Sequence, residues 1–171
     1  QLGMKDTHFV NTNGLPVANH YSSAYDIGLM SRELVKHEET KKWFTTWQTT
    51  IRVGLPGKPQ TEFGLTNTNR LIKTYDGANG IKTGFTQEAG YCLSASATRG
   101  ELTLIAVILG AATTKERFAE AATLLDYGFA NYDAIQLAEK GTSMGSVALD
   151  KAIPNEINGA VASDVSIFIK K

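Results

Sequence analysis

The fold is predicted most directly by the stretch Gly80-Ile81-Lys82-Thr83-Gly84-Phe85-Thr86. It follows a glycine-containing turn and opens a series of three strand candidates, which cover residues 80–85, 91–98 and 102–109. The last two candidates are joined by Arg99-Gly100-Glu101, a link of hairpin length. The sequence therefore predicts an antiparallel meander whose first strand carries Lys82-Thr83-Gly84.

Helical patterns flank this meander on both sides in the sequence. The predicted helices run from Ser22 or Ser23 to about Glu38, over residues 40–46, and from Thr113 or Thr114 to about Asn131. Two further strand candidates, at 47–53 and 61–65, could return antiparallel to each other. Strands and helices grouped in this way predict an α+β domain.

Two apolar groups are expected to contribute to the core. Residues 104–109 are apolar at every position, as expected for a central strand that is covered on both faces. Trp43, Phe44 and Trp47 are expected to pack in the core, with a ligand platform as the less favoured interpretation.

The composition of the chain limits the kinds of partner and of covalent link that we expect. The 171 residues include 42% apolar residues, and 17 basic residues balance 17 acidic ones. A formal net charge of zero gives no indication that the chain binds nucleic acid or an anionic membrane through its overall charge. Cys92 is the only cysteine, so no disulfide can form within the chain. No apolar run is long enough to span a membrane.

The character of the sequence changes after Tyr132. Residues 141–171 alternate glycine, serine and β-branched residues, which suits short strands of an all-β unit. We therefore expect one domain over 1–132 and the beginning of another over 133–171. Leu2-Gly3-Met4 resembles the end of a helix, so we also expect the chain to be a fragment of a longer protein.

Lys82-Thr83-Gly84 carries the clearest chemistry. Lys82 can place an ammonium group in a cleft, Thr83 adds a hydroxyl donor, and Gly84 lets a ligand backbone approach the strand. Together these groups could hold a peptide that ends in a carboxylate. The competing interpretation is an exposed lysine on a strand without a ligand.

Four blocks of sequence resemble one known family. The stretch 80–86, followed by Ala89-Gly90-Tyr91 and residues 95–98, resembles the third conserved motif of low-molecular-mass penicillin-binding proteins. Residues 7–26 and 67–72 resemble the same family, the serine-type D-alanyl-D-alanine carboxypeptidases. The resemblance extends from residue 2 to about 132, and residues 133–171 resemble the start of the β-rich domain that follows in this family.

The resemblance implies a fold, a reaction and site residues. The fold would be that of serine β-lactamases and penicillin-binding proteins, an antiparallel sheet with helices. Lys82, Thr83 and Gly84 would bind the substrate, with the first two on its terminal carboxylate, and the backbone N–H of Phe85 would be an oxyanion-hole donor. The reaction would be hydrolysis of the D-Ala-D-Ala bond of peptidoglycan stem peptides through a serine acyl-enzyme, outside the cytoplasmic membrane and without metal or organic cofactor. β-Lactam antibiotics would bind the same site.

Two motifs of this family are absent from the sequence. No serine or threonine has a lysine three positions later, so the nucleophile and general base of Ser-x-x-Lys are missing, and so is Ser-x-Asn. We therefore expect this chain alone not to be acylated. In the family both motifs lie upstream, and a separate N-terminal fragment that carries Ser-x-x-Lys is one candidate partner that would complete the site.

Several alternatives stay open. The chain could be a non-catalytic protein that binds peptidoglycan peptides or another partner, or a fragment of a β-lactamase. Gly141-Thr142-Ser143-Met144-Gly145 matches a nucleophile elbow by its letters, but its flanks favour a β loop. His8 and His20 are expected to make local hydrogen bonds, because no helical pair of histidines suggests a metal site.

Overall fold

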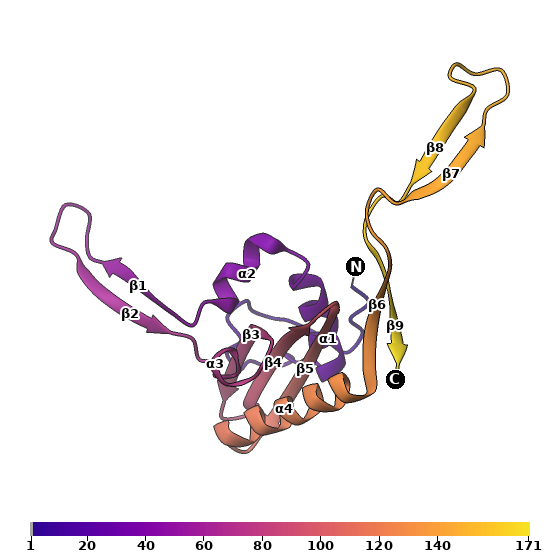
Figure 1. The fold of residues 1–171 in the computed structure, drawn as a ribbon. Helices are drawn as coiled ribbons and strands as arrows, with labels where there is room; N and C mark the ends of the chain where they lie inside the picture. Colours follow the sequence, from indigo (N-terminus) through magenta and orange to yellow (C-terminus); the bar gives the residue numbers. More distant parts are fainter. Residues whose placement is uncertain (1) are drawn as a thin grey trace. The chain divides into compact units, whose positions relative to one another are not determined.

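The computed structural model describes residues 2–171, which divide into two compact units (Figure 1). The first unit comprises the chain up to Thr98 and residues 103–128, and the second comprises residues 99–102 and 129–171. None of the helices over the described residues is long and apolar enough to cross a membrane.

The centre of the first unit is a three-stranded sheet in the order β3-β4-β5. Its strands are β3 (Ala78–Thr86), β4 (Gly90–Arg99) and β5 (Leu102–Ala111), which confirms the predicted meander. β3 and β4 are antiparallel, with Lys82 opposite Ser94 and Thr83 opposite Leu93.

The prediction that residues 104–109 form the central strand is wrong for the sheet that residues 2–171 build. β4 is central, and β5 lies at the edge. A run of apolar residues indicates that both faces of a strand are covered. It does not indicate whether both edges are paired, because edge pairing uses the backbone N–H and C=O groups that almost every residue has. The sequence of β5 therefore indicates its covered faces but not its place in the order.

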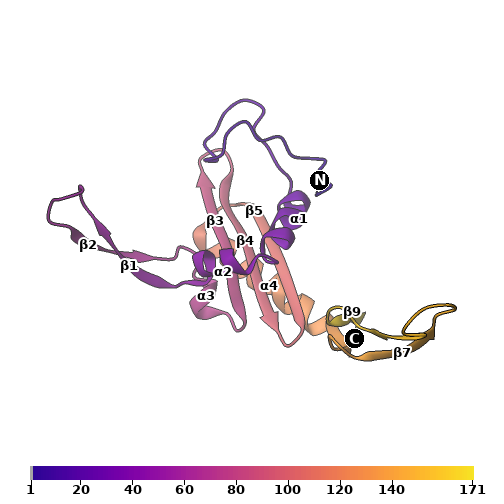
Figure 2. The same ribbon diagram turned by 90° about the horizontal axis from the view of Figure 1, so that it is seen from above.

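Helices cover both faces of the sheet (Figures 1 and 2). On one face lies α4 (Thr114–Asn131), and on the other lie α1 (Ala24–Leu34) and α2 (Glu38–Thr45). The alternation of side chains along β4 explains this arrangement. Ser94 shares a hydrogen bond of 2.7 Å with Ser31 of α1, whereas Leu93 and Ala95 point to the opposite face and are buried.

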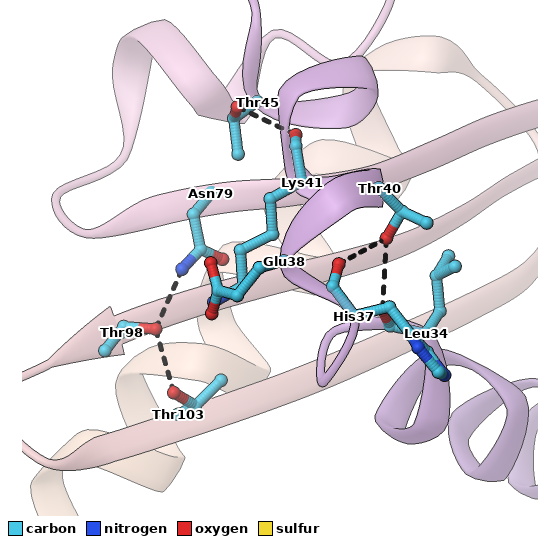
Figure 3. Close-up of polar contacts among 9 residues, drawn as sticks. All are labelled: Leu34, His37, Glu38, Thr40, Lys41, Thr45, Asn79, Thr98 and Thr103. Carbon is cyan, nitrogen blue, oxygen red and sulfur yellow. Dashed lines mark hydrogen bonds and ion pairs between the residues drawn. The ribbon is translucent and has the colours of Figure 1, made fainter.

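The helix boundaries follow from local signals. Ser23 caps α1, because its hydroxyl accepts a hydrogen bond of 3.2 Å from the backbone N–H of Asp26. α1 ends at Leu34, earlier than the predicted Glu38, which instead begins α2. The hydroxyl of Thr40 joins the two helices by donating to the carbonyl oxygens of Leu34 and His37, at 3.3 and 2.8 Å (Figure 3).

A row of polar side chains ties together the three strands of the sheet beneath α2. The amide of Asn79 donates to the hydroxyl of Thr98 at 2.8 Å, and that hydroxyl shares a hydrogen bond of 2.9 Å with Thr103 (Figure 3). Because these residues belong to β3, β4 and β5, the row links all three strands through their side chains.

The aromatic group at α2 differs from its prediction. Phe44 is buried against β3, but the side chain of Trp43 is 77% exposed and Trp47 is half-buried. Trp43 and Phe44 are neighbours on one helix and therefore point about 100° apart, and α2 turns Phe44 and not Trp43 towards β3. Only one of the three rings contributes fully to the core.

The remaining elements are short. β1 (Gln48–Val53) and β2 (Thr61–Thr66) form the predicted antiparallel hairpin, and α3 (Leu71–Thr74) precedes β3. In the second unit, β6 (Tyr132–Ala138) pairs with β9 (Val165–Lys170), and β7 (Ser143–Ala148) pairs with β8 (Glu156–Ala160). These antiparallel pairs have the strand character that was predicted for residues 141–171.

Candidate functional site

The predicted site residues lie on β3, which has β4 on one side and no strand of residues 2–171 on the other. Alternation along the strand exposes Lys82 and Gly84 and buries Thr83. An edge strand with an exposed lysine and glycine leaves its backbone accessible to an extended peptide. β3 is therefore an edge strand of the described sheet, and it exposes Lys82 and Gly84 of the predicted motif.

The ammonium group of Lys82 lies beside an open groove. It donates a hydrogen bond of 2.7 Å to the carbonyl oxygen of Thr83. The groove has a volume of about 820 Å³, and its wall includes Lys82, Thr68, Trp43 and Trp47. The ammonium group thus brings a positive charge to a mainly apolar hollow, where water screens a ligand charge less than in bulk solvent.

Thr83 is paired with a second threonine. Its hydroxyl shares a hydrogen bond of 2.6 Å with the hydroxyl of Thr68, a residue that the sequence did not single out. Thr68 is exposed, so the pair places a second hydroxyl beside the strand. Hydroxyl groups can donate to a carboxylate, so the region around β3 offers the paired hydroxyls of Thr68 and Thr83 as well as the Lys82 ammonium group as donors. The block 67–72 within the family resemblance was the signal that could have identified Thr68.

Two asparagines hold Thr68 in place. Asn69 is fully buried, and its amide donates a hydrogen bond of 2.7 Å to the carbonyl oxygen of Gly80 on β3. Asn67 donates to the carbonyl oxygens of Phe44 and Thr46 at 3.1 and 3.0 Å. The turn between β2 and α3 is therefore fixed to both β3 and α2, which positions the Thr68 hydroxyl.

Phe85 follows the glycine of the site. Its ring is 54% exposed and lies 4.4 Å from the ring of Tyr91, measured between centroids. Arg117 of α4 donates to the carbonyl oxygens of Gly84 and Cys92, at 3.1 and 3.2 Å. Burial lowers the pKa of the Arg117 guanidinium. This arginine was also missed, because nothing in its local sequence distinguishes it from a surface residue of an amphipathic helix.

The histidines make local contacts, as predicted. A ring nitrogen of His8 lies 2.6 Å from the carbonyl oxygen of Asn19, and His20 accepts a hydrogen bond of 2.9 Å from the backbone N–H of Val10. Over residues 2–171, no group of three or more histidine, cysteine or acidic side chains comes together that could hold a metal ion.

Comparisons with known proteins agree with one another. A family model for D-alanyl-D-alanine carboxypeptidases matches residues 1–113. The D-alanyl-D-alanine carboxypeptidase DacF of Bacillus subtilis (strain 168) is 42% identical over the whole chain, which spans 43% of DacF. DacD of Escherichia coli (strain K12) is 36% identical over 85% of this chain, which spans 36% of DacD.

Solved structures give the same result. Penicillin binding protein 5 from Haemophilus influenzae matches with a TM-score of 0.74 and 31% identity, over 99% of this chain and 48% of that chain. The Streptomyces K15 DD-transpeptidase matches with a TM-score of 0.72 and 32% identity, over 75% of this chain and 50% of that chain. The chain thus spans half or less of the length of these four proteins. It belongs to the D-alanyl-D-alanine carboxypeptidase family and has the mixed helix-and-sheet fold of the penicillin-binding proteins.

Proposed function

We propose that this chain supplies the substrate-binding wall of a serine-type D-alanyl-D-alanine carboxypeptidase. The observation that carries the proposal is the group formed by the Lys82 ammonium and the hydrogen-bonded hydroxyls of Thr68 and Thr83 on an accessible edge strand. These donors match the carboxylate at the end of a peptidoglycan stem peptide. Membership of the family supports the reaction class.

In this proposal the chain orients the substrate and stabilises charge. Lys82 attracts the terminal carboxylate, and Thr83 and Thr68 donate hydrogen bonds to it. The peptide lies along β3, with Gly84 leaving room for its backbone, so that the scissile carbonyl oxygen approaches the N–H of Phe85. That N–H would stabilise the negative charge that develops on the oxygen, and removal of such a donor typically slows a reaction ~10²–10³-fold.

The nucleophile would come from a segment outside this sequence. A serine of Ser-x-x-Lys would attack the scissile carbonyl, and its proton would pass through the lysine to the nitrogen of the departing D-Ala. Water would then hydrolyse the acyl-enzyme and release the shortened peptide. A β-lactam would acylate the same serine. We place this activity at the cell envelope, outside the cytoplasmic membrane, where peptidoglycan is processed.

Intact-mass spectrometry after incubation with benzylpenicillin tests the proposal. The measurement uses the protein purified from its native source together with any copurifying segment. We expect a penicilloyl adduct on a polypeptide or segment that carries Ser-x-x-Lys, and release of D-Ala from a diacetyl-Lys-D-Ala-D-Ala peptide. An adduct on residues 1–171 themselves would contradict the assignment of the nucleophile.

A non-catalytic peptide-binding protein is the second candidate. The absence of Ser-x-x-Lys from these 171 residues favours it. Such a protein would bind the diacetyl-Lys-D-Ala-D-Ala peptide through Lys82 and Thr83 but would form no adduct and release no D-Ala. Calorimetric titration with the peptide and with its C-terminal amide, set beside the mass measurement, separates the two functions.

A further inference from the structure

Arg117 is the only buried lysine or arginine among residues 2–171. It lies in the first turns of α4, is only 7% exposed, and reaches the backbone of the sheet. One terminal nitrogen donates to the carbonyl oxygens of Gly84 and Cys92, at 3.1 and 3.2 Å. Because Gly84 and Cys92 are opposite each other on β3 and β4, the guanidinium bridges the two strands just beside the Lys82-Thr83-Gly84 motif.

The charge of Arg117 is not neutralised by an ion pair. Among residues 2–171, no carboxylate lies within ion-pair distance of its guanidinium, and its buried Nε has no hydrogen-bond partner. The rings of Tyr91 and Phe118 flank it, with centroids 5.4 and 4.9 Å away. A buried and unpaired charge is costly, so its field acts strongly on the few groups around it.

The most important of these groups is the peptide between Gly84 and Phe85. Its carbonyl oxygen accepts from Arg117, and its N–H is the proposed oxyanion donor. In a trans peptide the C=O and N–H bonds point in opposite directions, so the Phe85 N–H points away from Arg117. A charge-assisted hydrogen bond to the oxygen draws electron density from the amide, which makes the N–H a stronger donor, and it also fixes the peptide plane.

A second contact holds the residue after this peptide. The ring of Tyr91 contacts the Arg117 guanidinium and also packs against the ring of Phe85, at 4.4 Å between centroids. Arg117 therefore contacts the peptide group before Phe85 directly, through the Gly84 carbonyl oxygen, and the Phe85 ring indirectly, through Tyr91.

We propose that Arg117 is a positioning residue that polarises and orients the Gly84–Phe85 peptide so that the Phe85 N–H acts as an oxyanion donor. This inference rests on the proposed function, because it assigns a purpose to a donor of that site. The alternative is a structural staple, in which Arg117 only holds α4 against β3 and β4. The two roles predict different effects on the rate constant of acylation, and they predict opposite changes in the hydrogen exchange rate of the Phe85 N–H.

The kinetic test compares Arg117→Met, Arg117→Lys and the control Lys115→Met in the full-length protein. Lys115 is an exposed cation on the same helix, so its loss changes the charge without touching the sheet. Stopped-flow acylation by a chromogenic cephalosporin gives the noncovalent dissociation constant K and the acylation rate constant k2. We expect Arg117→Met to lower k2 by about 10–100-fold, somewhat less than the loss of a whole donor, and to leave K within about threefold. Arg117→Lys should restore part of k2, and Lys115→Met should match the wild type.

A second readout does not require acylation. Base-catalysed hydrogen exchange of the Phe85 N–H, followed by NMR, reports the acidity of that amide. Polarisation by Arg117 predicts slower exchange of this N–H in a folded Arg117→Met variant, whereas loss of a staple predicts faster exchange through local opening.

The outcomes separate the inference from the function on which it rests. A wild-type protein that is never acylated would overturn the proposed function, while the exchange rate would still decide on polarisation. An acylated wild type with an unchanged k2 in Arg117→Met would overturn the inference alone. A raised K with an unchanged k2 would also overturn it, because Arg117 would then act on the bound ligand.

Discussion

At the scale of single residues, the proposed function assigns the Thr68–Thr83 pair to the terminal carboxylate of the substrate. Thr83→Val removes one hydroxyl and leaves the Thr68 hydroxyl without its partner at 2.6 Å. A hydrogen bond to a charged group contributes about 1.5–3 kcal/mol. We therefore expect kcat/KM of the full-length enzyme for a peptide with a free terminal carboxylate to fall about 10–100-fold. Thr68→Val should act in the same direction.

The control for this prediction is Thr61→Val, which removes an exposed hydroxyl from β2. It should leave kcat/KM unchanged. The same measurements with a C-terminally amidated peptide should show little difference between wild type and Thr83→Val, because the charged acceptor is gone. An equal loss for both peptides would mean that Thr83 acts on the structure of β3 and not on the carboxylate.

At the scale of elements, two glycines respond in opposite ways to an added methyl group. A Cβ at Gly80 of β3 would lie 2.8 Å from Ser96 Oγ and 2.9 Å from Phe44 Cδ2, so α2 would have to move. We expect Gly80→Ala to lower the free energy of unfolding by about 1–3 kcal/mol through overpacking. In α1, a Cβ at Gly28 would meet Val107 Cγ2 at an ordinary 3.9 Å. Gly28→Ala should raise the free energy of unfolding by about 0.5–1 kcal/mol, since alanine favours a helix.

Urea unfolding of the two variants, followed by circular dichroism, measures both changes. Each variant is the control for the other, because both add one methyl group to the first unit. Destabilisation by both variants to the same extent would show that the close packing of α2 on β3 is not the cause. Stabilisation by Gly80→Ala would contradict the contact between Phe44 and β3.

Elements were predictable from the sequence where their signals are local. The Ser23 cap, the apolar run of β5 and the helix from Thr114 depend on residues a few positions apart. The contacts that complete the candidate site are not local. Arg117 meets Gly84 across 33 positions and Thr68 meets Thr83 across 15, and neither pair leaves a periodic pattern in the sequence. The place of β5 at the edge has a different origin, because it follows from the consecutive order β3-β4-β5 of the predicted meander, whereas the apolar run of 104–109 alone suggested a central strand.

At the scale of the whole molecule, the candidate site and the C-terminal strands belong to different units. Lys82, Thr83, Phe85 and Arg117 all lie within the first unit, whereas residues 129–171 form most of the second. The contacts among these four residues and their neighbours come from elements of the first unit alone. We therefore propose that residues 133–171 form a separate domain that is not needed to build the site.

Removal of residues 133–171 tests this domain boundary. A chain that ends at Tyr132 should bind the diacetyl-Lys-D-Ala-D-Ala peptide with a dissociation constant within about threefold of that of the longer chain, since it keeps every donor of the site. Truncation removes the hydrogen bonds of 2.9 and 2.8 Å that Lys171 donates to the carbonyl oxygens of Phe129 and Asn131 in α4. We therefore expect a small fall in the thermal midpoint. Calorimetric titration and thermal unfolding of both chains, with Lys82→Met as the non-binding control, provide the comparison. Loss of peptide binding by a folded truncated chain would show that the β-rich unit contributes to the site, and the boundary at 132 would then separate two parts of one functional domain.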